Sequence, residues 1–159
     1  YPDRLVDIAS FTEIPHMVSQ VEPHVLNQQP EAKQWMDKYG VQAEAWAPFG
    51  EGRGGLFENP VLAEIGGKYG KTTAQVMLRW NIQRGIVVLP KSVHKDRMEQ
   101  NLNVFDFVLT DEDMARIGAL DTKTSSFFSH YDPGMVEWFV KMVEERKKQH
   151  DSSKEKKNW

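Results

Sequence analysis

Apolar residues follow two alternating patterns along the chain, short continuous runs and stretches with helical spacing. The runs predict strands at residues 17–22, 41–49 and 86–90. The third run, IVVLP, is β-branched and apolar throughout, which is typical of a strand covered on both faces. Helical spacing predicts helices at residues 2–10, 30–39, 60–70, 74–85, 95–103 and 110–120, and a last one from about 135. Strands separated by helices at this spacing indicate parallel β/α units.

Residues that favour helix starts mark several of these boundaries. Asn59 precedes a proline and predicts a helix cap, and Thr72 or Thr73 is suited to cap the helix that follows. Thr110 with Asp113 three residues later forms a weak capping box. We therefore expect each of these helices to begin at or just after the named residue.

Length and composition favour one globular domain with a charged end. The chain has 159 residues, 40% hydrophobic and 11% aromatic, enough to bury a core. Residues 1–140 are predicted to form the folded part of this domain. Residues 141–157 hold seven basic and four acidic residues, a charge of +3, so 141–159 is predicted to be a frayed helical tail.

Charge, hydropathy and cysteine usage exclude several classes of function. A net charge of −3 without a basic stripe argues against nucleic-acid binding, and no apolar run reaches membrane-spanning length. The chain has no cysteine, which fits a reducing compartment, and we expect a cytoplasmic protein. It also begins without methionine or a signal peptide, which suggests a piece of a longer chain.

Polar residues after the third strand form a candidate phosphate site. Lys91 and Ser92 follow the strand directly, and Arg97 and Asn101 lie four residues apart on one face of the next helix. Lysine offers a point charge, arginine a bidentate fork and serine a neutral donor, as a phosphate monoester requires. Ordinary solvated charges on a surface helix explain the spacing equally well at this stage.

Other chemistry is poorly supported by the sequence. GEGRGG at residues 50–55 matches a dinucleotide-binding glycine pattern, but Asn59 places the helix start beyond it and no acidic residue ends the next strand. We interpret this segment as a loop at the mouth of a strand. The five histidines have no metal-ligand spacing, and no nucleophile motif or general acid is assigned, so we predict neither a metal site nor a catalytic residue.

Four motifs in order resemble the aldo-keto reductase family. PKSVHKDRMEQN resembles the segment that holds the 2′-phosphate and adenine of NADP, usually K-S-x-x-x-x-R-x-x-E-N. SQVEPH resembles the N-Q-x-E strand, AWAPFGEGRGG the A-Y-S-P-L-G strand and loop, and FDFVLTDEDMARIGALD the next segment. The similarity extends from residue 1 to about 140, so it implies that residues 1–140 are the C-terminal part of an NADP-dependent oxidoreductase domain. It implies strands six to eight of a (β/α)8 TIM barrel, with their helices and a C-terminal helix.

The resemblance also implies a role for individual residues. Gln20 would bind the nicotinamide carboxamide and Trp46 would stack under the nicotinamide ring. The residues implied for the rest of the cofactor are Phe49 along the pyrophosphate, Lys91, Ser92 and Arg97 on the 2′-phosphate, and Gln100 and Asn101 beside the adenine.

Some positions depart from the family pattern. Gln100 replaces the usual glutamate, Ser19 the usual asparagine, and Trp46 a tyrosine whose stacking face it keeps. His94 and Lys95 replace a common Thr-Pro helix start, which weakens the expected cap.

The family places its catalytic Asp, Tyr, Lys and His on earlier strands, and about 250 residues are typical of a whole barrel. We therefore predict an NADP(H)-binding C-terminal half of an enzyme that reduces aldehydes or ketones, inactive alone. Three parallel strands leave open edges, so the alternative is a truncated interaction module that associates with itself. A different phosphate-binding β/α protein is a third possibility.

Overall fold

The computed structural model describes residues 1–129 and 131–155, with side chains up to residue 148. The chain divides into two compact units, Tyr1–Ser126 and Phe127–Trp159. The first unit contains the sheet and six α-helices, and the second contains one long helix. The predicted division at residue 140 falls inside that helix and stays a prediction.

Three parallel strands form the sheet of the first unit, as predicted. They are β1 (Val18–Val21), β2 (Gln42–Ala45) and β3 (Val87–Val88), in the order β1-β2-β3. All three are shorter than expected. The last ladder bonds run from Trp46 N–H to Val21 O and from Leu89 N–H to Ala45 O, and beyond them the chains have no strand neighbour to pair with.

The helices of this unit match the predicted ranges to within a few residues. They are α1 (Pro2–Phe11), α2 (Pro30–Lys38), α3 (Pro60–Tyr69), α4 (Thr73–Gln83), α5 (Lys95–Leu102) and α6 (Asp111–Gly118). Asn59 Oδ1 accepts hydrogen bonds from two N–H groups of the first turn of α3. Thr72, rather than Thr73, caps α4, and Thr110 caps α6 with the predicted capping box.

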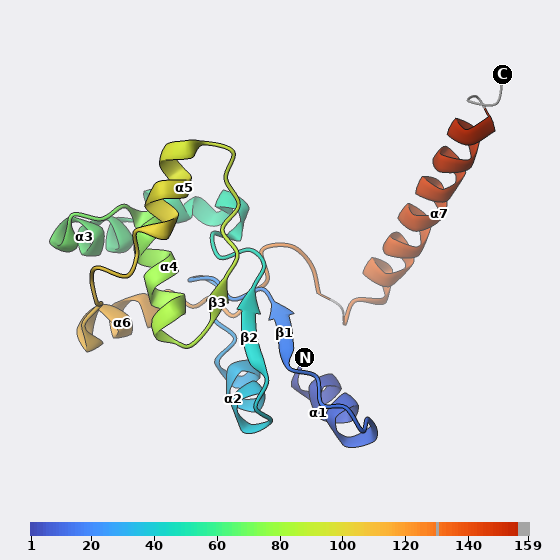
Figure 1. Cartoon of the computed structure of the whole chain (residues 1–159), viewed down its shortest axis with the longest axis horizontal. Coiled ribbons are helices and arrows are strands. Elements are labelled where there is room, and N and C mark those ends of the chain that lie inside the picture. Colours follow the sequence, from blue (N-terminus) through green and yellow to red (C-terminus); the bar gives the residue numbers. More distant parts are fainter. Residues whose placement is uncertain (130, 156–159) are drawn as a thin grey trace. The chain divides into compact units, whose positions relative to one another are not determined.

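One face of the sheet is covered by helices. Ala43 and Ala45 of β2 are fully buried and pack with Leu5 of α1 and Met36 of α2. Small side chains on the strand let the helices approach the sheet closely. The covered face therefore anchors β1 and β2 against the N-terminal part of the chain (Figure 1).

The opposite face of the sheet is exposed within this unit. Val18 of β1 is 53% exposed, and Val87 and Leu89 at and after β3 are each 43% exposed. Gln20 and Glu44 lie between them on the same face, because Gln20 pairs with Glu44 and Glu44 with Val87. Parallel sheets normally have both faces covered, so this arrangement is consistent with part of a barrel.

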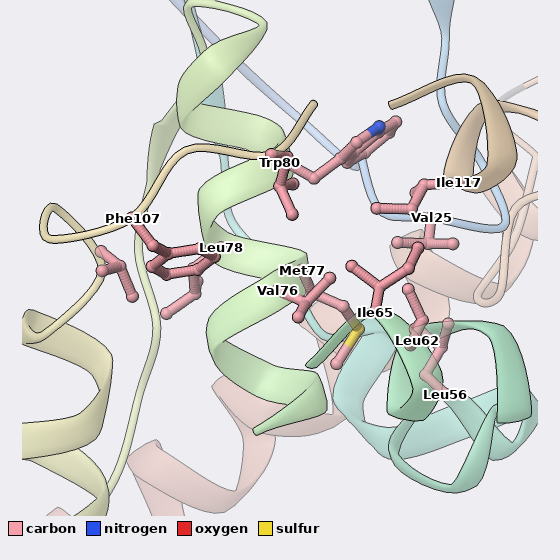
Figure 2. Packing of buried hydrophobic residues seen from close by; sticks show 12 residues of the cluster. Val25, Leu56, Leu62, Ile65, Val76, Met77, Leu78, Trp80, Phe107 and Ile117 are labelled. Atoms are coloured by element: carbon pink, nitrogen blue, oxygen red, sulfur yellow. The ribbon is translucent and has the colours of Figure 1, made fainter. Parts of the chain in front are cut away.

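The main core lies between α3, α4, α6 and the loop before α6 (Figure 2). Its largest buried side chain is Trp80 of α4, which packs with Val25 and Ile117 from elements far apart in the sequence. The Arg84 guanidinium lies 4.2 Å from the Trp80 ring. Burial of these side chains fixes α4 against the loop that follows β1.

A buried carboxylate joins α3 to α6. The Asp113 side chain is 3% exposed; it accepts hydrogen bonds from Lys68 Nζ at 2.9 Å, from the Thr110 hydroxyl at 2.8 Å and from the Tyr69 hydroxyl. Burial alone would raise the pKa of the Asp113 carboxyl, but hydrogen bonds from these three donors outweigh it and hold the pKa well below its usual range.

Asp113→Asn is therefore expected to lower the free energy of unfolding by about 1–3 kcal/mol at neutral pH. A depressed folded-state pKa stabilises the fold above the unfolded-state value of about 3.9, and this stabilisation is lost as the pH falls toward the folded-state pKa. The difference between wild type and variant should thus narrow in acid. Urea unfolding of both proteins at neutral pH and near pH 3 measures this difference in unfolding free energy. If the difference is the same at both pH values, the ionised Asp113 carboxylate does not stabilise the fold as described.

The second unit is formed by α7 (Pro133–Glu155) and the segment before it. Phe128 packs edge-on against Phe139 with ring centroids 5.0 Å apart, and Trp138 lies 5.1 Å from Phe139. The helix begins at Pro133, two residues before the predicted start, because proline fits the first turn of a helix. Residues 156–159 of the predicted tail lie outside the described residues. No helix in the described ranges has the length and apolar character to cross a membrane.

Candidate cofactor site

The carboxyl ends of the three strands meet at one edge of the sheet (Figure 1). Trp46 follows β2 directly, and Lys91 and Ser92 come shortly after β3. Ligands of open α/β sheets bind outside this edge. The predicted site residues therefore come from β1, from the ends of β2 and β3, from the start of the glycine-rich segment and from the helix α5.

Gln20 and Trp46 belong to one face of the sheet. Gln20 and Glu44 are register partners, and Trp46 lies two residues after Glu44, so all three share the exposed face. Gln20 Nε2 donates a hydrogen bond of 2.6 Å to Glu44 Oε1. This face joins an amide, a carboxylate and an indole, a combination suited to a flat polar ring.

Phe49 lies at the start of the glycine-rich segment Gly50–Glu58. It is half-buried and its ring centroid is 5.6 Å from that of Phe57, which fixes both ends of the segment. Gly54 has φ +67°, in the left-handed region that favours glycine, and a Cβ there would lie 2.6 Å from Leu26 Cδ1, so a larger residue would be strained and would displace the Leu26 side chain. The next α-helix begins at Pro60, as expected, so the glycines do not open a helix as a dinucleotide fingerprint requires.

Lys91 and Arg97 are exposed near the start of α5, whereas Ser92 is half-buried. Ser92 Oγ accepts a hydrogen bond from His94 N–H at 3.1 Å, and the His94 side chain gives no cap to the helix, in line with the weak cap expected there. Lys91 and Arg97 are exposed and have no ion-pair or hydrogen-bond partner among the described residues.

Gln100 and Asn101 occupy different environments on α5. Gln100 is exposed, whereas Asn101 is half-buried. Asn101 lines a groove of about 340 Å³ whose other walls are apolar, formed by Ile82, Val88, Pro90, Met98, Leu102, Val104 and Phe105. The groove lies along the open edge of β3, so it is a second apolar surface that this unit leaves uncovered.

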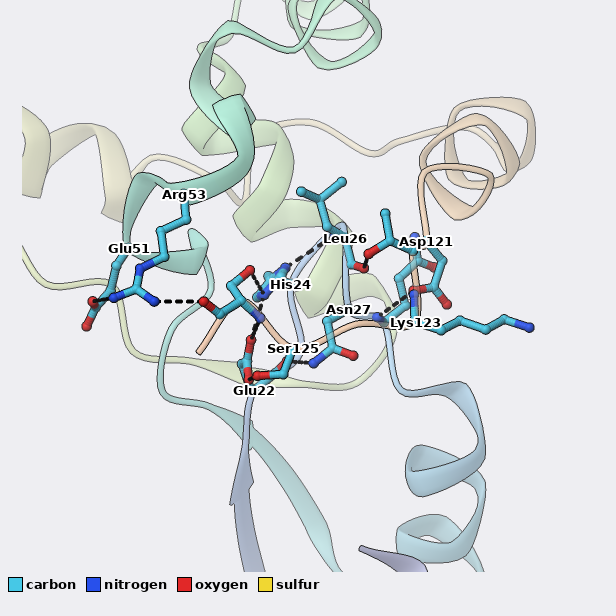
Figure 3. A network of polar contacts seen from close by, with 12 residues as sticks. Glu22, His24, Leu26, Asn27, Glu51, Arg53, Asp121, Lys123 and Ser125 are labelled. Carbon is cyan, nitrogen blue, oxygen red and sulfur yellow. Dashed lines mark hydrogen bonds and ion pairs between the residues drawn. The ribbon is translucent and has the colours of Figure 1, made fainter. Parts of the chain in front are cut away.

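The structure also reveals a buried polar network that sequence reasoning missed (Figure 3). Glu22 accepts hydrogen bonds from the Ser125 hydroxyl at 2.6 Å and Ser126 N–H at 2.8 Å, and lies 2.9 Å from His24 Nε2. Arg53 of the glycine-rich segment donates to Ser126 O at 2.7 Å. The network thus connects that segment, the end of β1 and residues 125–126. The sequence feature that could have indicated this network is the SQVE motif, which ends at Glu22.

This network is not a catalytic triad. Leu26 N–H donates to His24 Nδ1, so the proton of the neutral ring is on Nε2. Both Glu22 and Ser126 Oγ approach Nε2, the latter at 3.1 Å. A general base would need an unprotonated nitrogen toward the serine, and here that nitrogen carries the proton.

The residues present fit a nicotinamide dinucleotide phosphate better than a metal ion. Two exposed cations without partners among the described residues suit a phosphate, and the Gln20–Trp46 face suits a nicotinamide. Within the described ranges no three His, Asp or Glu side chains gather as a metal ion would require.

Parallel β/α folds of several classes bind ligands at the carboxyl ends of their strands, so the comparisons identify the class of this protein. The Aldo/keto reductase family model matches residues 2–122. The chain therefore belongs to the aldo/keto reductase family. This excludes the possibility of an unrelated phosphate-binding β/α protein.

Relatives and solved structures support the assignment. The chain is 44% identical over 117 residues to the uncharacterized oxidoreductase YtbE of Bacillus subtilis, covering 74% of this chain and 41% of that protein. It is 37% identical over 118 residues to methylglyoxal reductase DkgA of Escherichia coli K12, covering 74% and 42%. Thus the chain spans less than half the length of these relatives.

Two solved structures match with similar coverage. MGS-M4, an aldo-keto reductase from a Medee basin deep-sea metagenome library, has a TM-score of 0.78 and 38% identity, covering 82% of this chain and 48% of that one. A mutant of Gox0644 in complex with NADPH has a TM-score of 0.74 and 35% identity, covering 80% and 46%. The three strands of this chain therefore correspond to part of the family's barrel.

Proposed function

We propose that this chain is the NADP(H)-binding C-terminal part of a reductase for aldehydes or ketones. The observation that carries the proposal is the pair Lys91 and Arg97, both exposed and without a partner among the described residues, after β3 and in the first turn of α5. Gln20 and Trp46 supply an amide and a ring for the nicotinamide end. Bound NADPH would supply the hydride, and the residues of this chain would hold and orient the cofactor.

The residues assigned here bind the cofactor and include no proton donor. Reduction of a carbonyl needs an acid positioned at the carbonyl oxygen. We therefore propose that the chain alone does not reduce carbonyl compounds, and that it acts in the cytoplasm with the strands that carry the acid. The relatives named as glyoxal and methylglyoxal reductases make small aldehydes the first substrates to test.

Tryptophan fluorescence tests the cofactor proposal directly. Titration of the full chain with NADPH should quench its emission at lower concentration than titration with NADH, because only NADPH carries the 2′-phosphate. Trp46→Phe keeps a stacking face and should remove most of the quenching. No quenching by millimolar NADPH, with the fold intact by circular dichroism, would reject the proposal.

Self-association is a second proposal, favoured by the exposed face of the sheet. Val87 and Leu89 are apolar and 43% exposed, beside the open edge of β3. Open apolar strands of this kind pair with a strand of another chain. In a pure sample the available partner is a second copy of this chain.

Sedimentation at tens of micromolar should therefore give a mass above the 18.3 kDa of one chain. The double change Val87→Lys and Leu89→Lys should shift it toward the monomer, because buried lysines disfavour pairing of this face. Val108→Lys, at a residue 61% exposed in the loop before α6, is the control and should leave the mass unchanged. A wild-type chain that is monomeric at this concentration would contradict the proposal.

A further inference from the structure

The hydrogen bond between Gln20 and Glu44 fixes which way the Gln20 amide faces. Gln20 Nε2 lies 2.6 Å from Glu44 Oε1. An ionised carboxylate only accepts hydrogen bonds, so the amide must turn its NH2 group toward Glu44. Because the two residues are register partners on adjacent parallel strands, the backbone ladder holds their side chains together.

This orientation leaves the Gln20 carbonyl available to a ligand. No hydrogen-bond partner of Gln20 Oε1 occurs among the described residues. Trp46, two residues after Glu44, is on the same face of the sheet. An N–H donor on a planar ring stacked at Trp46 would thus meet an acceptor whose direction is already set.

We propose that Glu44 is a positioning residue: it orients the Gln20 amide so that Gln20 Oε1 accepts a hydrogen bond from the nicotinamide carboxamide N–H. This inference rests on the proposed function, since it concerns the nicotinamide end of the same site. Glu44 itself need not touch the cofactor. Without its carboxylate the whole Gln20 side chain is free to populate several rotamers as well as both amide orientations, and only one of these arrangements presents the carbonyl to the ligand.

Charge alone predicts the opposite result. Glu44 is an anion at a site for an anionic cofactor, so its removal would strengthen binding of NADPH if it acted only as a charge. An orienting role predicts weaker binding, and only for a cofactor that has the carboxamide N–H.

The test compares NADPH with its reduced 3-acetylpyridine analogue, which has the same charge but no carboxamide N–H. Dissociation constants of the full chain come from tryptophan quenching. Glu44→Ala should weaken NADPH binding by about 5- to 10-fold, the range expected for one hydrogen bond, and analogue binding by less than about 2-fold. Glu44→Asp keeps a carboxylate that only accepts hydrogen bonds and should retain part of the preference, whereas Glu44→Gln can also donate to Gln20 Oε1 and should lose it. Glu13→Ala removes an exposed carboxylate outside the site and should change neither constant.

A second readout needs no cofactor. In the free chain, the side-chain amide resonances of Gln20 should differ between the wild type and Glu44→Ala, because the substitution removes the acceptor of the Gln20 NH2 group. Unchanged Gln20 resonances in Glu44→Ala would overturn the inference. So would equal effects of this substitution on both cofactors, or tighter binding of both. If neither cofactor quenches the wild-type chain, the proposed function fails and the inference with it.

Discussion

Arg97→Ala is expected to weaken NADPH binding by about 10- to 100-fold, the range for loss of a charge-assisted contact to phosphate. NADH lacks the 2′-phosphate, so its dissociation constant should change by less than about 3-fold. Arg97 is exposed on the first turn of α5 and has no partner among the described residues, so its removal leaves no buried charge behind. Competitive displacement or fluorescence titration of both cofactors measures the two effects.

Lys95→Ala is the matched control on the same helix. The Lys95 side chain is 87% exposed and lies 3.7 Å from Glu99, so its removal takes away one positive charge without a predicted contact to cofactor. We expect a change of less than about 3-fold, decreasing further with added salt. The loss of NADPH affinity in Arg97→Lys should lie between those of Lys95→Ala and Arg97→Ala, because lysine keeps the charge and loses the bidentate fork. Equal losses in Lys95→Ala and Arg97→Ala would mean that only general electrostatics acts here.

Trp80→Ala is expected to lower the free energy of unfolding by about 3–5 kcal/mol, the range for truncation of a buried large aromatic residue. Trp80 is 1% exposed in the main core and also carries the Arg84 guanidinium on its ring. The substitution would leave a cavity between α4, α6 and the loop after β1. Urea unfolding followed by circular dichroism at 222 nm gives the change, provided that the variant still folds.

Trp80→Phe keeps the variant measurable if the alanine change abolishes folding, and it should cost less because most of the volume stays filled. Phe105→Ala removes another aromatic ring that is 67% exposed, and should change the unfolding free energy by no more than about 0.5 kcal/mol. Similar losses for Trp80→Ala and Phe105→Ala would show that the main core around Trp80 is not packed as described.

The main consequence of the fold is that the proposed cofactor site lies on a sheet with one uncovered face. The helix-covered face, with Ala43 and Ala45, is closed by α1 and α2. The other face exposes Val18 and Val87 and also carries Gln20. The proposed cofactor site and the proposed self-association surface therefore lie on the same face of the sheet.

Much of the fold was predictable from local patterns. The three strands, their parallel alternation with helices, and the caps at Asn59 and Thr110 follow from short-range chemistry, because a cap or an apolar run acts within a few residues. The motif PKSVHKDRMEQN likewise placed Lys91 and Arg97 after a strand and on a helix without knowledge of distant residues. The roles of the eight predicted site residues stay predictions.

What the sequence by itself determined is the order of elements, the family and the residue types at the strand ends, since each depends on neighbours along the chain. Only the tertiary structure decided that Gln20 meets Glu44 and that Glu22 receives hydrogen bonds from residues 125 and 126. These contacts join residues 24 to 104 positions apart, and strand register and loop packing set them. No local pattern encodes a register, because shifting a strand by two residues keeps the same alternation of faces and changes every partner.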